Sequence, residues 1–220
     1  MLLSYLLCSG TPSYGNSSDF VLKKRMDIEK DDTCNTFEFS MSNHLGTHVD
    51  CPNHFYEDGL KITDYPGNFW QCHSVQVLRH DIPAGELCDT GHLDIAWDKS
   101  EKNTTAEMVV FVSGWYKRRR EDIYWREPPG FVPETYFWLL QKFPCIRFFG
   151  FDLISLSSFA HREIGREAHK VFLNGKHPIL PVEDMDLSSI ETNDLNSILI
   201  SPLFIKGADA APCTVWGNFI

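Results

Sequence analysis

Residues 44–54 constrain the fold of this chain more than any other segment. They read His-Leu-Gly-Thr-His-Val-Asp-Cys-Pro-Asn-His and place three of the nine histidines close to one aspartate. His48 and Asp50 are two residues apart, so an extended strand would point both side chains to the same face, with their Cα atoms about 7 Å apart. Two side chains at that separation can bind one ion, so the segment predicts a strand with ligands on one face.

The same segment cannot be straight if its outer histidines share the site. An extended chain from His44 to His54 would reach roughly 33 Å, which is far too long for a single metal site. The chain must therefore turn on both sides of the central strand. Gly46 and Pro52 are suited to those two turns, because glycine accepts a positive φ and proline has a restricted φ that many turns require.

Imidazole nitrogens and carboxylate oxygens are the usual donors for Zn²⁺ and related ions, so these side chains predict a metal site. Two other interpretations compete with it: ordinary surface or hydrogen-bonded histidines, and a purely structural zinc site. Structural zinc sites prefer cysteine ligands and close all four positions. Histidines combined with a carboxylate therefore favour a catalytic site, in which an open position holds water.

The bulk composition argues against some classes of partner. With 220 residues, the chain is long enough for one large domain and short for two. Its net charge of −10 argues against nucleic acid, because a surface that follows phosphates needs clustered lysine and arginine. The one basic run, Lys117–Arg120, is followed at once by Glu121 and Asp122, which predicts a solvated loop or a frayed helix end.

Cysteine usage and the N-terminal residues bear on the compartment. The seven cysteines are irregularly spaced and form no Cys-x-x-Cys pair, so the sequence predicts neither a disulfide framework nor a zinc ribbon. A reducing cytoplasm is the expected compartment. The apolar residues Leu2–Leu7 have no basic stretch before them and are too few to span a bilayer, so we expect a buried first strand and no membrane partner.

Short strand-like runs are spread over the whole chain, and two helices are legible between them. The runs are Leu2–Leu7, Thr36–Met41, Ser74–Leu78, Met108–Val112, Ile146–Phe151 and Ile198–Ile205. One predicted helix begins near Pro133, and the other runs from Ala160 to Leu173 and ends before Asn174-Gly175. The apolar stripe expected on the second helix is Ile164, Ala168, Val171 and Phe172. The pattern predicts a mixed α/β fold dominated by sheet.

The pattern His44-x-Gly-Thr-His48-x-Asp50-x-Pro-x-His54-Phe55 resembles the signature of the cyclase family of metal-dependent hydrolases, which includes bacterial kynurenine formamidases and isatin hydrolases. The resemblance continues in later segments, namely Val112–Trp115, Pro128–Phe131 and Phe149–Ser155. It covers most of the chain and is strongest over residues 44–59 and 108–187. It implies an α/β fold of the swivelling β/β/α type, in which a mixed sheet packs with helices and residues 1–220 form a single domain.

The resemblance also implies two divalent metal ions, with zinc favoured over manganese. By matching positions, the first ion would be bound by His44, His48 and Asp50, and Asp50 would bridge to the second ion. The remaining ligands match His169 and Glu183, and the alternatives to His169 are His161 and His177. Glu183 has independent support, because it follows the apolar run of residues 178–182 and a carboxylate near the core needs a partner.

The implied reaction is hydrolysis of a carbon–nitrogen amide bond in a formamide or cyclic amide by attack of a metal-activated water, with His54 as general acid and base. Tyr14 and Phe55 are expected to contact an aromatic substrate. Family members often have an aromatic-Pro-Gly-Asp stretch where this chain has Tyr14-Gly15-Asn16, which leaves the substrate open. The implied partners are a small-molecule amide and further copies of the chain in a dimer or tetramer. A competing hypothesis is a non-catalytic, metal-stabilised protein that binds a small ligand on the same fold.

Overall fold

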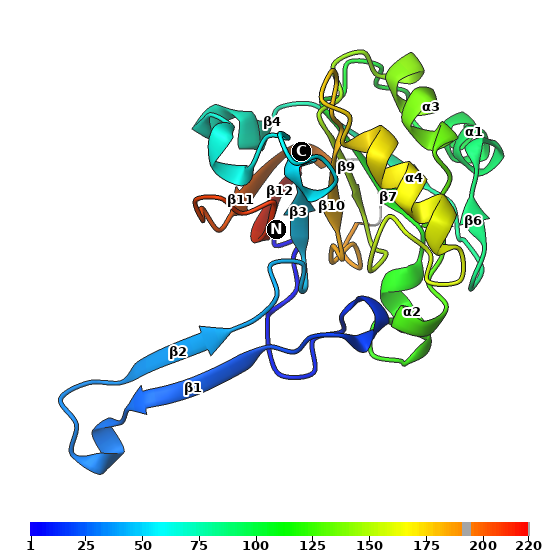
Figure 1. Ribbon diagram of the computed structural model, residues 1–220. Helices are drawn as coiled ribbons and strands as arrows, with labels where there is room; N and C mark the ends of the chain where they lie inside the picture. Colours follow the sequence, from blue (N-terminus) through cyan, green and yellow to red (C-terminus); the bar gives the residue numbers. More distant parts are fainter. Residues whose placement is uncertain (191–194, 220) are drawn as a thin grey trace.

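A mixed eight-stranded sheet forms the centre of the molecule (Figure 1), and the computed structural model describes residues 1–190 and 195–219. In spatial order the strands are β4 (Gln71–Cys72), β11 (Leu195–Pro202), β12 (Ala210–Phe219), β3 (His48–Asp50), β10 (Leu180–Glu183), β9 (Phe148–Phe151), β7 (Met108–Val112) and β5 (Val75–Arg79). From β10 to β5 the neighbours are parallel, and from β10 to β4 they are antiparallel. The mixed sheet confirms the predicted α/β class.

The sheet curls strongly, because its two edge strands are almost consecutive in the chain. β4 ends at Cys72 and β5 begins at Val75. Three steps along the backbone cover at most about 11 Å, so the two edges must lie close together. A flat sheet of eight strands would separate them by about 33 Å. The sheet therefore approaches a closed barrel.

Side chains alternate between two hydrophobic cores on either side of the sheet. On β7, Met108 and Val110 belong to the core enclosed by the curled sheet, whereas Val109 and Phe111 face the helices. This two-sided burial explains why the central strands read as continuous apolar runs. At Gly150 on β9, an added Cβ would lie 2.5 Å from Met185 Sδ, so a larger residue there would force the Met185 side chain to shift.

Four helices lie outside the sheet: α1 (Thr90–Lys99), α2 (Ile123–Arg126), α3 (Glu134–Lys142) and α4 (Arg162–Phe172). The two legible helices of the sequence correspond to α3 and α4. The expected stripe of α4 was partly wrong. Ala168 and Phe172 are buried, but Ile164 is exposed and its place is taken by Gly165 and His169. A Cβ on Gly165 would lie 2.2 Å from Ser157 Oγ, so glycine lets α4 approach the 155–158 loop.

The central strand β3 positions the ligand segment inside the sheet. It pairs antiparallel with β12 on one side and with β10 on the other, so that His48 lies opposite Glu183 and Asp50 lies opposite Ala210. The two predicted turns are present. Gly46 has a φ of +70°, and Pro52 begins a short 3-10 helix that ends at His54.

A two-stranded hairpin projects from the body (Figure 1). It consists of β1 (Val21–Met26) and β2 (Thr36–Ser40), and it confirms a strand over the Thr36–Met41 run. Nearly every residue of the hairpin is exposed, so this strand contributes nothing to the core. A second small sheet pairs β6 (Leu87–Cys88) with β8 (Gly130–Phe131).

The N-terminal residues differ from the expected first strand. Leu2 and Ser4 form only isolated bridges, to Trp216 and Met185, and no strand extends over Leu2–Leu7. Leu3 alone is fully buried, whereas Leu6 is largely exposed, because no neighbouring strand is in register along the whole segment. No helix within residues 1–190 and 195–219 is long and apolar enough to cross a membrane.

Candidate metal centre

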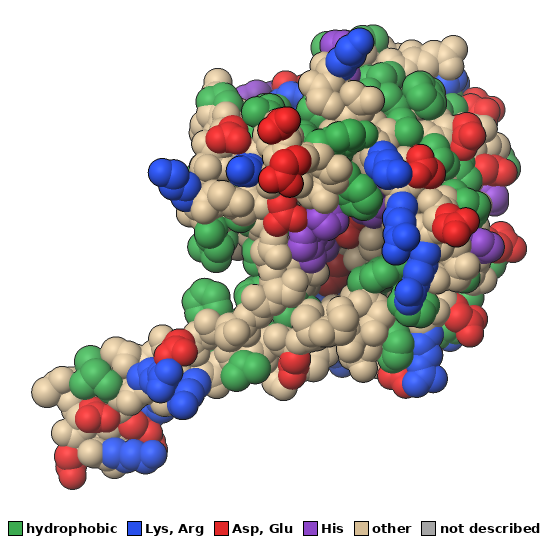
Figure 2. Space-filling view, viewed as in Figure 1, with side chains coloured by type: hydrophobic (Ala, Val, Ile, Leu, Met, Phe, Trp, Pro, Cys, Tyr) green, Lys and Arg blue, Asp and Glu red, His purple; other side chains and the backbone are tan. Residues whose placement is uncertain are grey.

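A cavity of about 500 Å³ opens beside the ends of β3 and β10 and the face of α4. Its lining includes every residue of the preferred assignment of ligands, acid–base group and substrate contacts. These are Tyr14, His44, His48, Asp50, His54, Phe55, His169 and Glu183. Figure 2 shows histidine side chains gathered at this hollow. Residues far apart in the chain thus meet at one place.

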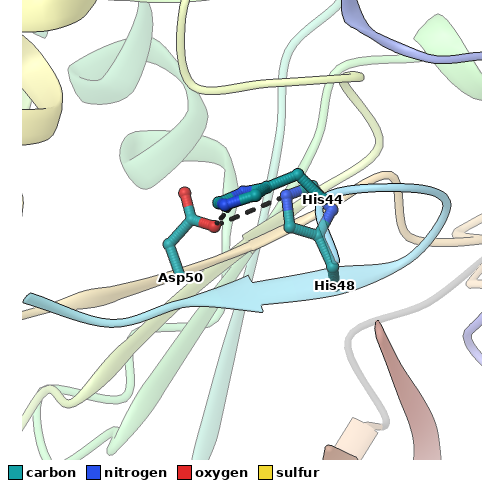
Figure 3. Close-up of side chains that lie close together, drawn as sticks. All are labelled: His44, His48 and Asp50. Atoms are coloured by element: carbon teal, nitrogen blue, oxygen red, sulfur yellow. Dashed lines mark ion pairs between the residues drawn. The ribbon is translucent and has the colours of Figure 1, made fainter. Parts of the chain in front are cut away.

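The first group of ligand atoms comes from β3 and the turn before it (Figure 3). Asp50 Oδ1 lies 3.0 Å from His44 Nδ1 and 3.5 Å from His48 Nε2. His48 Nδ1 lies 2.9 Å from the Gly46 carbonyl oxygen, which fixes the tautomer by accepting its proton and leaves the lone pair on Nε2. Both His48 Nε2 and Asp50 Oδ1 are buried without a hydrogen bond of acceptable geometry. Two buried polar atoms that converge without a partner fit an ion between them.

The second group joins β10 to α4. His169 Nε2 lies 3.4 Å from Glu183 Oε1 and 3.7 Å from Asp50 Oδ2. The other ring nitrogen, Nδ1, is 2.9 Å from the Gly165 carbonyl oxygen, so Nε2 again carries the lone pair. Glu183 also accepts a hydrogen bond from the Leu156 backbone N–H at 2.7 Å.

The two alternative histidines lie outside the cavity. His161 is exposed, and its Nε2 is 3.1 Å from the Gly85 carbonyl oxygen. His177 is exposed in the loop after α4. Only His169 among the three points towards the carboxylates, because it occupies the buried face of α4.

Asp50 belongs to both groups, one oxygen towards each. Around a tetrahedral zinc ion with ligands near 2.1 Å, neighbouring ligand atoms are about 3.4 Å apart. The separations of 3.0 to 3.7 Å within the two groups match that spacing. The donor set and its geometry therefore fit divalent metal ions.

The electrostatics of the site point in the same direction. Burial alone would lower the pKa of His44, but its contacts with Asp209 and Asp50 outweigh burial and raise that pKa to about 10. Burial would raise the pKa of Asp50, yet His44 reverses the effect and holds it below the usual range. Burial likewise opposes protonation of His169, and Glu183 raises its pKa. The buried carboxylates are thus stabilised by nearby positive charge, which a divalent ion would supply.

Asp209 is a member of the site that the sequence interpretation missed. Its Oδ2 lies 2.8 Å from His54 Nδ1 and 3.1 Å from His44 Nε2, and its Oδ1 accepts a hydrogen bond from Asn43 at 2.7 Å. Contacts with these two histidines lower the pKa of Asp209. An acid immediately before the apolar start of β12 was the only local signal. The pairing of β12 with β3 that brings Asp209 to the site is not visible in sequence.

The two expected substrate contacts line the cavity in different ways. Tyr14 lies in a short 3-10 helix, and its ring meets Phe159 edge to face with centroids 5.4 Å apart. Phe55 stacks on the His169 ring, 5.2 Å between centroids, and also contacts His54. Phe55 therefore supports the imidazoles, whereas Tyr14 lines the cavity beside Phe159.

One residue of the basic run, Arg119, is partly buried, which corrects the interpretation as a solvated loop or a frayed helix end for that residue. Arg119 donates two hydrogen bonds to Asp184, at 2.8 and 2.7 Å, and its guanidinium lies 3.7 Å from the centre of the Tyr5 ring. Tyr124 donates a third hydrogen bond to the same carboxylate. Asp184 directly follows Glu183, so this network fixes the end of β10 beside the candidate ligands. Lys117 and Arg120 are exposed as expected.

Comparison with known proteins identifies the family. Residues 2–158 match the family model described as putative cyclase, so this chain belongs to the cyclase family. It is 26% identical over 192 residues to cyclase-like protein 1 of Arabidopsis thaliana, covering 81% of this chain and 67% of the relative. It is 27% identical over 188 residues to the kynurenine formamidase of Bacillus mycoides (strain KBAB4), covering 84% and 80%.

Solved structures confirm the fold over the whole chain. Isatin hydrolase A from Labrenzia aggregata superposes with a TM-score of 0.83 at 19% identity, covering 100% of this chain and 93% of the other. An isatin hydrolase bound to the product analogue thioisatinate gives a TM-score of 0.82 at 18% identity, covering 100% and 92%. The family model ends before His169 and Glu183, so for these two residues the fold and the geometry are the evidence.

We expect Arg119→Leu to lower the free energy of unfolding by about 3–5 kcal/mol, because it leaves the buried Asp184 carboxylate without its charged partner. Arg120→Leu is the matched control, and its exposed side chain should change stability by no more than about 0.5 kcal/mol. Urea unfolding followed by tryptophan fluorescence measures both. Similar small losses for the two variants would show that the Arg119–Asp184 pair is not a structural anchor.

Proposed function

We propose that this chain is a metal-dependent hydrolase that cleaves a carbon–nitrogen amide bond in a small molecule. One observation carries the proposal: the two oxygens of buried Asp50 face two separate groups of ligand atoms at the base of a cavity, with His54 beside them. The activities named for relatives and for structures of the same fold, kynurenine formamidase and isatin hydrolase, support an amide substrate. A formamide or a cyclic amide of the arylformamidase type fits this site.

In this proposal the first ion is held by His44, His48 and Asp50, and the second by Asp50, His169 and Glu183. Three imidazoles and two carboxylates favour zinc over manganese. When bound, such ions lower the pKa of water and polarise a carbonyl group, which is the chemistry that amide hydrolysis needs.

His54 supplies the proton transfer. Asp209 holds its Nδ1, which leaves Nε2 free to exchange a proton with the leaving nitrogen of the amide. Asn43 in turn fixes Asp209. Asp209 is therefore a positioning residue. It also orients His44 by its contact with His44 Nε2. One carboxylate thus fixes the ring orientations of both a proposed ligand and the acid–base group.

Three side chains that could act as nucleophiles, Cys51, Ser113 and Ser155, are buried or engaged in other contacts, which favours attack by water. Cys51, the cysteine next to Asp50 in sequence, is fully buried in the enclosed core, and burial raises the pKa of its thiol. Ser113 donates its hydroxyl proton to Asp152, so it is committed to a structural bond. Ser155 lies 3.4 Å from Glu183, a proposed ligand.

The proposed assembly is a homo-oligomer, built through the projecting hairpin. Leu22, Phe37 and Phe39 share one face of the hairpin, and each is more than half exposed. A two-stranded hairpin is marginal in water without a surface to pack on. The same chain exposes Leu203, Phe204, Ile205 and Trp216 on the body. In this proposal, the hairpin face of one copy packs against the apolar surface of a second copy.

The proposed compartment is reducing, such as the cytoplasm, because all seven cysteines are free.

Metal content tests the ligand assignment without reference to activity. Protein purified without chelator should contain about two ions per chain by elemental analysis. Asp50→Asn should reduce this towards zero because both sites lose a ligand, whereas Glu183→Gln should retain about one ion. Asp58→Asn, the same change at an exposed position, is the control. Equal metal content in wild type and Asp50→Asn would refute the shared carboxylate.

Turnover tests the role of His54. His54→Gln should lower kcat for formanilide hydrolysis by about 10²–10⁴-fold while metal content stays near wild type. Asp209→Asn should give a smaller loss of kcat, since the hydrogen-bond geometry is partly kept. His161→Gln serves as the control at an exposed histidine. If no amide is hydrolysed by metal-loaded wild type, the non-catalytic binding hypothesis is favoured instead.

Oligomeric state tests the role of the hairpin. The double variant Leu22→Ser/Phe37→Ser should shift the mass measured by light scattering towards a single chain, because it removes the apolar face. Val21→Ser, on the opposite face of the same hairpin, should leave the mass unchanged. A wild-type protein that is already monomeric at micromolar concentration would contradict the proposed assembly.

A further inference from the structure

Helix α4 presents a row of three side chains to the cavity. Arg162, Arg166 and His169 follow one another at intervals of four and three residues, which places them on one helix face, and all three line the cavity. His169 is buried among the metal ligands, whereas the two arginines are exposed. At 1.5 Å per residue, Arg166 lies roughly 4.5 Å and Arg162 roughly 10.5 Å along the helix axis from His169. The row therefore leads from the metal centre to the cavity mouth.

Neither guanidinium forms an ion pair with a carboxylate of residues 1–190 and 195–219. Five other arginines do so, namely Arg25, Arg118, Arg119, Arg126 and Arg147. The chain has 30 acidic and 20 basic residues, so two arginines without an acidic partner on one helix face leave a local excess of positive charge there. Figure 2 shows basic side chains over α4 beside the histidines of the hollow. Local positive charge at the mouth contrasts with the negative charge of the whole protein.

Aromatic rings hold one of these arginines in place. The Arg162 guanidinium lies 3.8 Å from the centre of the Phe159 ring, which itself contacts Tyr14. Burial raises the pKa of Tyr14, and the positive charge of Arg162 opposes that rise. A guanidinium stacked on a ring loses little further freedom when it binds an anion. The Arg162 side chain also contacts the Tyr14 hydroxyl, and its remaining N–H groups can donate to an anion.

We propose that Arg162 and Arg166 bind an anionic group of the substrate, so that the preferred substrate is an amide carrying a carboxylate on the order of 5–10 Å from the scissile carbonyl. This inference rests on the proposed amide hydrolysis. The metal centre fixes the carbonyl end, the rings of Tyr14 and Phe159 flank the middle, and the guanidiniums hold the far end.

A matched pair of substrates tests the proposal. 4-Formamidobenzoate carries the carboxylate, and 4-formamidobenzamide has the same shape without the charge. Metal-loaded wild type should show a kcat/KM about tenfold or more higher for the anion, mainly through KM. Arg162→Gln and Arg166→Gln should each reduce this ratio, and the double variant should bring it near one. Arg126→Gln, which removes an exposed arginine elsewhere, should leave the ratio unchanged.

The outcomes separate this inference from the proposed function. Equal kcat/KM for the two amides in wild type, or an unchanged ratio in the double variant, overturns the anion site and leaves amide hydrolysis standing. If neither amide is hydrolysed, the result counts against amide hydrolysis. The anion site is then tested by calorimetry alone, with 4-aminobenzoate and 4-aminobenzamide as ligands of wild type and of the double variant. Tighter binding of the carboxylate that the double variant loses supports the anion site, and equal binding by both proteins overturns it.

Discussion

The arrangement of the site depends on the burial of one carboxylate, Asp50, in the middle of the curled sheet. It is only 1% exposed on the three-residue strand β3, between β12 and β10. An ionised carboxylate at such depth is tolerated only beside compensating charge. The protein surrounds it with imidazoles from its own strand and from α4, and their nitrogens converge without satisfying one another fully. This unsatisfied convergence is what a divalent ion would complete.

Long-range pairing then determines which groups surround that carboxylate. β10 brings Glu183 opposite His48, and β12 carries Asp209 to the edge of the site, where it contacts His44 and His54. One strand pairing therefore places Glu183 beside His48, and the other places Asp209 beside His44 and His54. The Arg119–Asp184 pair secures the end of β10, so that a residue outside the cavity lining supports the position of the candidate ligand Glu183.

The sequence alone predicted those parts of the candidate site whose side chains and backbone turns lie close together in the chain. Residues 44–54 predicted ligands on one face of a strand with turns on both sides, because the period of a strand and the conformations of glycine and proline are local properties. His169 was harder, since a histidine at a helix edge is equally compatible with simple burial. Asp209 could not be predicted, because only the β12–β3 pairing brings it to the site. The same limit explains Arg119, whose acidic partner lies 65 residues away.

The cavity carries negative side chains at its base and positive side chains at its mouth, and this separation of charge can orient a charged substrate. Carboxylates are concentrated at its base, where divalent metal binding would neutralise them. Arginines without acidic partners among the described residues lie at its mouth, on the same helix that supplies His169. A neutral substrate would gain nothing from this gradient, whereas an anionic amide would be oriented by it, with the carbonyl inward and the carboxylate outward. Helix α4 carries both a candidate ligand, His169, and the two arginines. The spacing of these residues along the helix therefore sets the distance between the reacting amide bond and the bound carboxylate.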